Sequence, residues 1–174
     1  MTSLSQALEH WHDFFLATGG AAATLVGLLF VALSLHLRSV VSQPDVGSLA
    51  RVTLTDFTSV LLAALMVLIP TDHSSTKGWE LLAVAAVNLP RTIMIARGAF
   101  ARERSGTFDP ALLFRRFGLS LACYVGLGAV AALFVAGQPE NALGWLAGVC
   151  IALILTALRN TWYLLVTVAD ADDA

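Results

Sequence analysis

Five long apolar stretches alternate with short polar ones along this chain. A helix rises 1.5 Å per residue, so about 20 apolar residues cross a hydrocarbon layer about 30 Å thick. Five transmembrane helices in a single domain are therefore predicted, at about residues 14–37, 52–70, 79–100, 112–136 and 142–168. The predicted fold class for residues 1–174 is all-α, a polytopic transmembrane helical bundle.

The segment before the first predicted span has a helical pattern of its own. Leu4, Leu8, Trp11 and Phe15 recur every three or four residues. We expect residues 3–13 to form a short amphipathic helix that lies at the membrane surface and leads into the first span.

The third predicted span is interrupted by Asn88, Pro90 and Arg91. A proline inside a helix removes a backbone hydrogen bond and usually bends the helix, which membrane proteins tolerate where neighbours satisfy the freed carbonyl. Five spans are predicted, and four remain the alternative if this segment does not cross.

Charged residues are sparse and unevenly placed. The chain is 57% hydrophobic and 13% charged, whereas soluble domains carry about 25% charged residues. Arginines gather in or beside the first and third connections, at Arg38, Arg51, Arg97, Arg102, Arg104, Arg115 and Arg116. The other side of the predicted bundle has only Lys77. The positive-inside rule therefore places the N-terminus outside and the C-terminus in the cytoplasm.

Three charged side chains fall inside predicted spans: Asp56, Arg91 and Arg159. A charge in hydrocarbon is costly, so each needs a partner or a function. Counted from the predicted span ends, Asp56 and Arg159 both lie about 6 Å from the cytoplasmic boundary, with Arg91 about one turn deeper. We predict that they form a charged cluster in the inner leaflet, with three further members: Asn88, Asn160 and His36.

This predicted cluster has two interpretations. It is either a structural ion pair that fixes which helices are neighbours, with the second arginine extending to phosphate headgroups, or a charged constriction or ion site. Because positive charge is in excess, the second interpretation favours anions or lipid headgroups as ligands.

Small residues recur at helical spacing in the first, fourth and fifth spans. Those of the first and fifth are Gly19, Gly20, Ala23, Thr24, Gly27, Ser34, Gly144 and Gly148. Lipid provides no hydrophobic drive between helices, so close contact at small residues promotes their association. We expect these faces to pack helices within one chain, or to join copies of the chain and line a pore.

Sequence motifs of enzyme chemistry are absent: the chain has no HExxH, GxSxG, P-loop or CxxC motif. Cys123 and Cys150 lie in apolar runs and are predicted to be buried thiols. His10 and His12 would point to different sides of a helix and are interpreted as solvated. We therefore expect no catalytic residue, no metal site, no cofactor and no nucleic-acid partner.

The opening run W-H-x-F-F, followed by GGAAATLVGLLFVALSL, resembles the start of a family of small, uncharacterised bacterial multi-span membrane proteins, over residues 11–37. That resemblance implies a bacterial inner-membrane location and no assigned activity. A fainter likeness is to Orai-type channel subunits, whose first helix lines a central pore. It rests on the Gly/Ala-rich first span and a second span ending in LMVLIPTD. Those channels have an acidic selectivity residue at the outer end of a pore helix. This chain lacks such a residue unless Asp13 takes that place, so the likeness does not imply calcium selectivity.

These patterns lead to two functional expectations. The first is a homo-oligomeric channel or pore-type transport subunit of the bacterial inner membrane, with the small face of its first helix at the oligomer axis. Its expected partners are the lipid bilayer, further copies of the chain, and an ion or lipid headgroup. The alternative is a non-transporting adaptor or regulatory protein that binds another membrane protein through the same faces.

Overall fold

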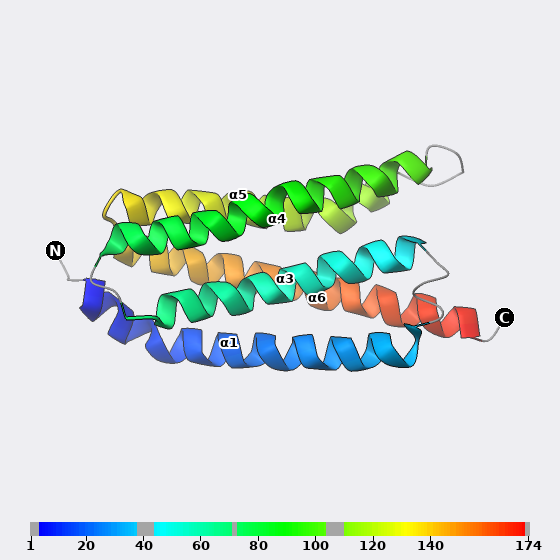
Figure 1. The fold of residues 1–174 in the computed structure, drawn as a ribbon, viewed down its shortest axis with the longest axis horizontal. Coiled ribbons are helices and arrows are strands. Elements are labelled where there is room, and N and C mark those ends of the chain that lie inside the picture. Colours follow the sequence, from blue (N-terminus) through cyan, green and yellow to red (C-terminus); the bar gives the residue numbers. More distant parts are fainter. Residues whose placement is uncertain (1–3, 38–43, 71–72, 104–109, 173–174) are drawn as a thin grey trace.

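Consecutive helices run in opposite directions along one long bundle (Figure 1). The structure is a computed structural model that describes residues 4–37, 44–70, 73–103 and 110–172, with side chains described for 6–37, 46–70, 73–98 and 117–166. Its helices are α1 (Leu4–Leu35), α3 (Pro44–Leu68), α4 (Ser74–Glu103), α5 (Pro110–Val135) and α6 (Pro139–Asp172). The predicted all-α fold class is confirmed.

Helix α3 is central to the packing, since it contacts α1, α4 and α6. The most extensive contact is between α4 and α5, which lie together on one side of the bundle, while α1 lies on the other (Figure 1). Large side chains fill the interior between them, among them Phe15, Phe57, Tyr124, Phe134, Leu143 and Leu146.

All five helices contain a segment long and apolar enough to cross a membrane. These segments are Gln6–Leu35, Val46–Leu68, Ser74–Gly98, Phe117–Val135 and Pro139–Val166. Large apolar side chains also cover the outside of the bundle, and many of them are more than half exposed, for example Leu28, Phe30, Val87, Met94, Val125 and Leu155. Such a surface suits lipid rather than water, and the chain is a multi-pass membrane protein.

The helix bounds differ from the predicted spans most clearly in α1 and α3. Helix α1 runs from Leu4 to Leu35 without a break, so the predicted surface helix continues directly into the first span, and Ser3 lies outside the described residues. Helix α3 begins at Pro44, eight residues before the predicted start. Helix α4 continues through Pro90, so the five-span prediction holds rather than the four-span alternative.

Side chains of α4 tie together the helix ends at one end of the bundle. Ser74 Oγ donates to the Phe134 carbonyl of α5 at 2.7 Å. Lys77, fully buried, donates from Nζ to the carbonyls of Met66 and Ile69 at the end of α3. A cation near the last carbonyls of a helix also interacts favourably with the helix dipole. The single cation predicted for this end is therefore a structural cap.

The described arginines lie toward the opposite end of the bundle. Because α3 runs against α4 and α6, Arg51 in the first half of α3 lies toward the same end as Arg91, Arg97 and Arg159. Of the other arginines used to predict the orientation, Arg38 and Arg104 lie outside the described residues, and no side-chain position is described for Arg102, Arg115 and Arg116. The orientation in the membrane stays a prediction.

Candidate functional site

The first half of α3 is rich in hydroxyl groups, yet it is helical and largely buried. Thr53 Oγ1 donates to the Leu49 carbonyl at 2.8 Å, Thr55 Oγ1 to Arg51 at 2.7 Å, and Ser59 Oγ to Thr55 at 2.7 Å. Each hydroxyl thus bonds to the carbonyl four residues earlier in its own helix, which satisfies the donor locally. This local bonding allows a polar segment to lie inside an apolar bundle.

Asp56 is the buried acid of this segment, with no exposed surface. Its carboxylate accepts hydrogen bonds from Ser120 Oγ at 2.7 Å and from Tyr124 Oη at 2.9 Å. Ser120 and Tyr124 are four residues apart on α5 and therefore lie on the same face of that helix. Hydroxyl donors to a carboxylate give short, charge-assisted bonds, which offset part of the cost of burying the acid.

A further side-chain contact joins α3 to α4. Asn88 Nδ2 donates to Ser59 Oγ at 3.1 Å, and Tyr124 Oη lies 3.1 Å from the same oxygen while its proton is on Asp56. The polar network, which we define as Asp56, Ser59, Asn88, Ser120 and Tyr124, therefore joins α3, α4 and α5. It fixes the relative position of three helices and leads from a fully buried acid to a half-buried amide.

Two members of the predicted charged cluster, Asp56 and Asn88, belong to the polar network. The arginines do not contact Asp56. Arg91 is exposed, and Arg159 is half-buried on α6. Among the described side chains, Asp56 forms no ion pair. Its partners are the hydroxyls of Ser120 and Tyr124.

The remaining members lie elsewhere. Asn160 is fully buried on α6, and neither polar atom of its side chain has a hydrogen-bond partner among the described residues. His36 lies just beyond α1, beside Thr161 and Leu164 of α6. The contacts within the described residues thus bring Asp56 and Asn88 into one network and leave Arg91 and Asn160 out of it, and a common layer for the predicted cluster stays a prediction.

The position of Asp56 along α3 differs from the predicted one. It lies twelve residues after the helix begins at Pro44 and twelve before it ends at Leu68, which places it at the middle of the helix. A span taken to begin near residue 52 had placed the acid too close to one end.

A lateral groove of about 430 Å³ opens between α3 and α4. Its polar lining consists of Thr55, Thr58, Ser59, Asn88 and Arg91, and its apolar lining consists of Leu54, Leu62, Ala83, Val84 and Val87. Since Ser59 and Asn88 belong to both the groove and the polar network, the groove leads inward to Tyr124 and Asp56.

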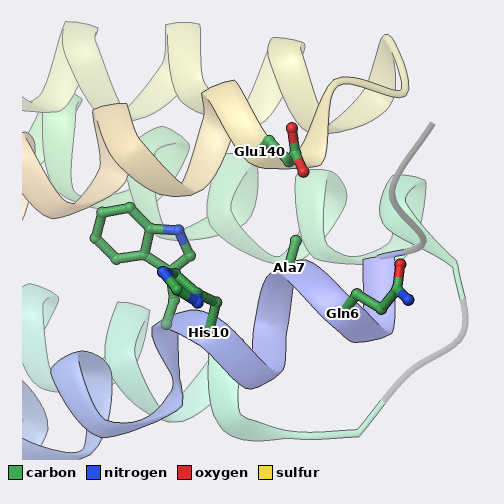
Figure 2. Close-up of a pocket in the computed structure, with 5 residues that line it drawn as sticks. Gln6, Ala7, His10 and Glu140 are labelled. Carbon is green, nitrogen blue, oxygen red and sulfur yellow. The ribbon is translucent and has the colours of Figure 1, made fainter.

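A second hollow, of about 380 Å³, lies at the opposite end of the bundle from the arginines. Figure 2 shows its lining: Gln6, Ala7, His10 and Trp11 of α1, with Glu140 at the start of α6. His10 and Glu140 are the metal-ligating side-chain types among them. Nowhere in the described part of the chain do three His, Cys, Asp or Glu side chains come together as a metal ion would require.

The small residues of α1 lie on two different faces. Gly19 is buried, and a Cβ there would lie 3.2 Å from Ala64 of α3, so this side packs within the chain. The outward small face is the set of five exposed residues Gly20, Ala23, Thr24, Gly27 and Ser34. A Cβ at Gly20 or Gly27 would meet no atom within 4 Å. On α6, Gly144 and Gly148 are exposed as well.

Sequence reasoning missed Ser120 and Tyr124, the two partners of Asp56. Their signal was present as two hydroxyl residues four positions apart in an otherwise apolar run. No protein-family model, curated protein or solved structure matches the chain in comparisons with known proteins. Functional conclusions therefore depend on the geometry alone.

Proposed function

We propose that the protein is a non-enzymatic subunit of a homo-oligomer in the bacterial inner membrane, and that the oligomer acts as a channel or pore-type transport unit. The observation that carries this proposal is the outward small face of α1. Its residues are exposed while Gly19 on the other side of the helix packs against Ala64. A small, unoccupied face lets a second helix approach closely, which is the contact that drives helix association in lipid.

The packed interior of a single chain argues for a path between chains. Phe15, Tyr124, Phe134 and Leu143 are fully buried in the core of the bundle. Five helices packed around such side chains enclose no wide aqueous passage, so a conducting path requires several copies around an axis. In this proposal α1 lies nearest that axis, with the N-terminus outside and the C-terminus in the cytoplasm.

One observation favours the alternative of a membrane adaptor. Thr24 Oγ1 donates to the Gly20 carbonyl at 2.9 Å, and Ser34 Oγ donates to Val31 at 2.8 Å. The two hydroxyls of the outward small face thus use their protons within their own helix, which suits a dry helix–helix contact. Such a contact would serve a different membrane protein as well as a second copy.

Molecular mass in detergent separates these proposals. The purified protein is expected to form an oligomer that the double variant Ala23→Leu, Gly27→Leu reduces to monomer, because two leucines fill the outward small face. The matched control is Ala129→Leu, Ala132→Leu, two exposed positions on α5, which should keep the oligomer. A monomeric native protein would contradict the homo-oligomer.

Ion flux then tests transport. Liposomes that contain the purified oligomer are expected to release a trapped ion faster than empty liposomes, and the α1 double variant should abolish the difference. A stable oligomer with no flux above background for anions or cations would contradict the pore and leave the adaptor.

A further inference from the structure

The groove between α3 and α4 is mainly polar toward one end, where Leu54 is its apolar lining residue, and apolar toward the other. Leu62 of α3 and Ala83, Val84 and Val87 of α4 line it toward the Lys77 end of the bundle. Thr55 of α3 and Asn88 and Arg91 of α4 lie toward the arginine-containing end, since the two helices run in opposite directions. Its volume of about 430 Å³ falls within the range of about 300–1,000 Å³ that small-molecule sites occupy.

Arg91 is a charge without a protein partner in this groove. It is exposed, and none of the ion pairs or hydrogen bonds within the described residues involves it. It also lies within the candidate membrane span Ser74–Gly98. A charged arginine inside a span needs a counter-charge or access to the headgroup region.

The groove offers hydrogen-bond donors to an anion. Thr55 and Ser59 donate to carbonyls of their own helix, so their protons are not available to a ligand. Thr58 has no partner among the described residues, and Asn88 uses only one of its two N–H groups, on Ser59. With the five N–H groups of Arg91, these donors form a set that fits a phosphate group.

The apolar end of the groove distinguishes a lipid from a free anion. A phospholipid in the leaflet at the arginine-containing end would place its phosphate near Arg91 and extend its acyl chain toward the bilayer centre. On that course the chain would lie along Val87, Val84 and Leu62, which line the groove. Inorganic phosphate has no apolar part that could contact this lining.

We propose that the α3–α4 groove binds an anionic phospholipid, with Arg91, Asn88 and Thr58 on the phosphate and one acyl chain against Leu62, Val84 and Val87. This groove is separate from the outward small face of α1. Lipid binding can therefore be tested on the monomer as well as on the proposed oligomer, and its failure would not bear on the oligomer.

Native mass spectrometry of the full-length protein, titrated with phosphatidylglycerol, tests the proposal. Arg91→Gln is expected to weaken binding by about tenfold, because it removes a charge-assisted contact. The matched control is Arg97→Gln, which changes an exposed arginine of the same helix that does not line the groove. Binding to the control should equal that of the native protein, and an equal loss in both variants would overturn the site in favour of general attraction to positive charge.

A second variant tests the apolar end without changing any charge. Ala83→Phe places a ring in the groove at an exposed position, and it should weaken phosphatidylglycerol binding while Ala129→Phe on α5 should not. Unchanged binding in Ala83→Phe would overturn the assignment of the acyl chain. Two competitors identify the ligand: inorganic phosphate, which lacks acyl chains, and diacylglycerol, which lacks phosphate. Neither is expected to displace the lipid, and either one binding as tightly as phosphatidylglycerol would overturn the proposal.

Discussion

Asp56 is a buried acid that forms no ion pair with any side chain that the structure describes. Ser120 and Tyr124 donate to its two carboxylate oxygens at 2.7 Å and 2.9 Å. Removing one partner of a buried polar pair leaves the other partner unsatisfied, which costs more than the bond itself contributes. The hydroxyls of α5 are therefore as important to the bundle as the acid.

Tyr124→Phe tests the polar network by removing a single hydroxyl group. It removes the hydroxyl that donates to Asp56 and lies 3.1 Å from Ser59 Oγ, and it leaves the ring in place, so packing changes little. We expect a loss of about 1–2 kcal/mol in the free energy of unfolding, within the range of hydrogen bonds in membrane interiors and of bonds to charged groups. Thermal unfolding in detergent measures it. Thr24→Val, an exposed hydroxyl bonded within its own helix, is the control and should unfold like the native protein; an equal loss in the two variants would contradict the network.

Lys77→Met tests the cap at the end of α3. The substitution keeps most of the aliphatic stem but removes the donor to the Met66 and Ile69 carbonyls. We expect destabilisation by about 1–3 kcal/mol, because two carbonyls at the end of α3 lose a charged hydrogen-bond donor. Thr76→Ala, an exposed neighbour, should have little effect in the same thermal measurement. A melting temperature unchanged by Lys77→Met would show that water replaces the cap.

At the scale of helices, hydropathy predicted the number of spans but not where each begins. The start of α3 was missed because Asp45, Ser48 and Arg51 make residues 44–52 resemble a polar loop. Back-bonding hydroxyls, such as Thr53 to Leu49, conceal that polarity in a helix. The partners of Asp56 could not be predicted either, because helix rotation and register decide which polar residues meet. Mean hydropathy carries no information about register.

Gly78→Ala tests the close contact of α4 with α5. A Cβ at Gly78 would lie 2.7 Å from Val135 Cγ2 and 2.8 Å from the Ala131 carbonyl oxygen. Because one of these atoms is backbone, the helices must separate, and we expect a loss of about 1–3 kcal/mol. Gly128→Ala is the control, since a Cβ there meets nothing within 4 Å and alanine favours a helix. If both variants unfold at the temperature of the native protein, the close packing of α4 on α5 is contradicted.

For the whole molecule, the two ends of the bundle differ in charge. Arg51, Arg91, Arg97 and Arg159 lie toward one end, and Lys77 at the other is buried as a cap. Under the positive-inside rule this asymmetry favours a cytoplasmic position for the arginine-containing end.

Cysteine labelling tests that orientation. His73 and Gln138, exposed at the Lys77 end, and Leu37, exposed at the other end, are suitable positions. Because Cys123 and Cys150 are buried, a membrane-impermeant maleimide should report mainly on the introduced thiols. We expect labelling of His73→Cys and Gln138→Cys in intact cells, and of Leu37→Cys only after permeabilisation. The reverse pattern would invert the orientation.

Disulfide cross-linking at the outward small face of α1 tests the proposed homo-oligomer most directly. Gly27→Cys introduces a thiol on a face that none of the described residues covers, and Val125→Cys introduces one at an exposed position on α5. In native membranes under mild oxidation, Gly27→Cys is expected to give a cross-linked dimer at low expression level and Val125→Cys to stay monomeric. Absence of the dimer for Gly27→Cys, or equal cross-linking of both variants, would contradict an assembly built on α1.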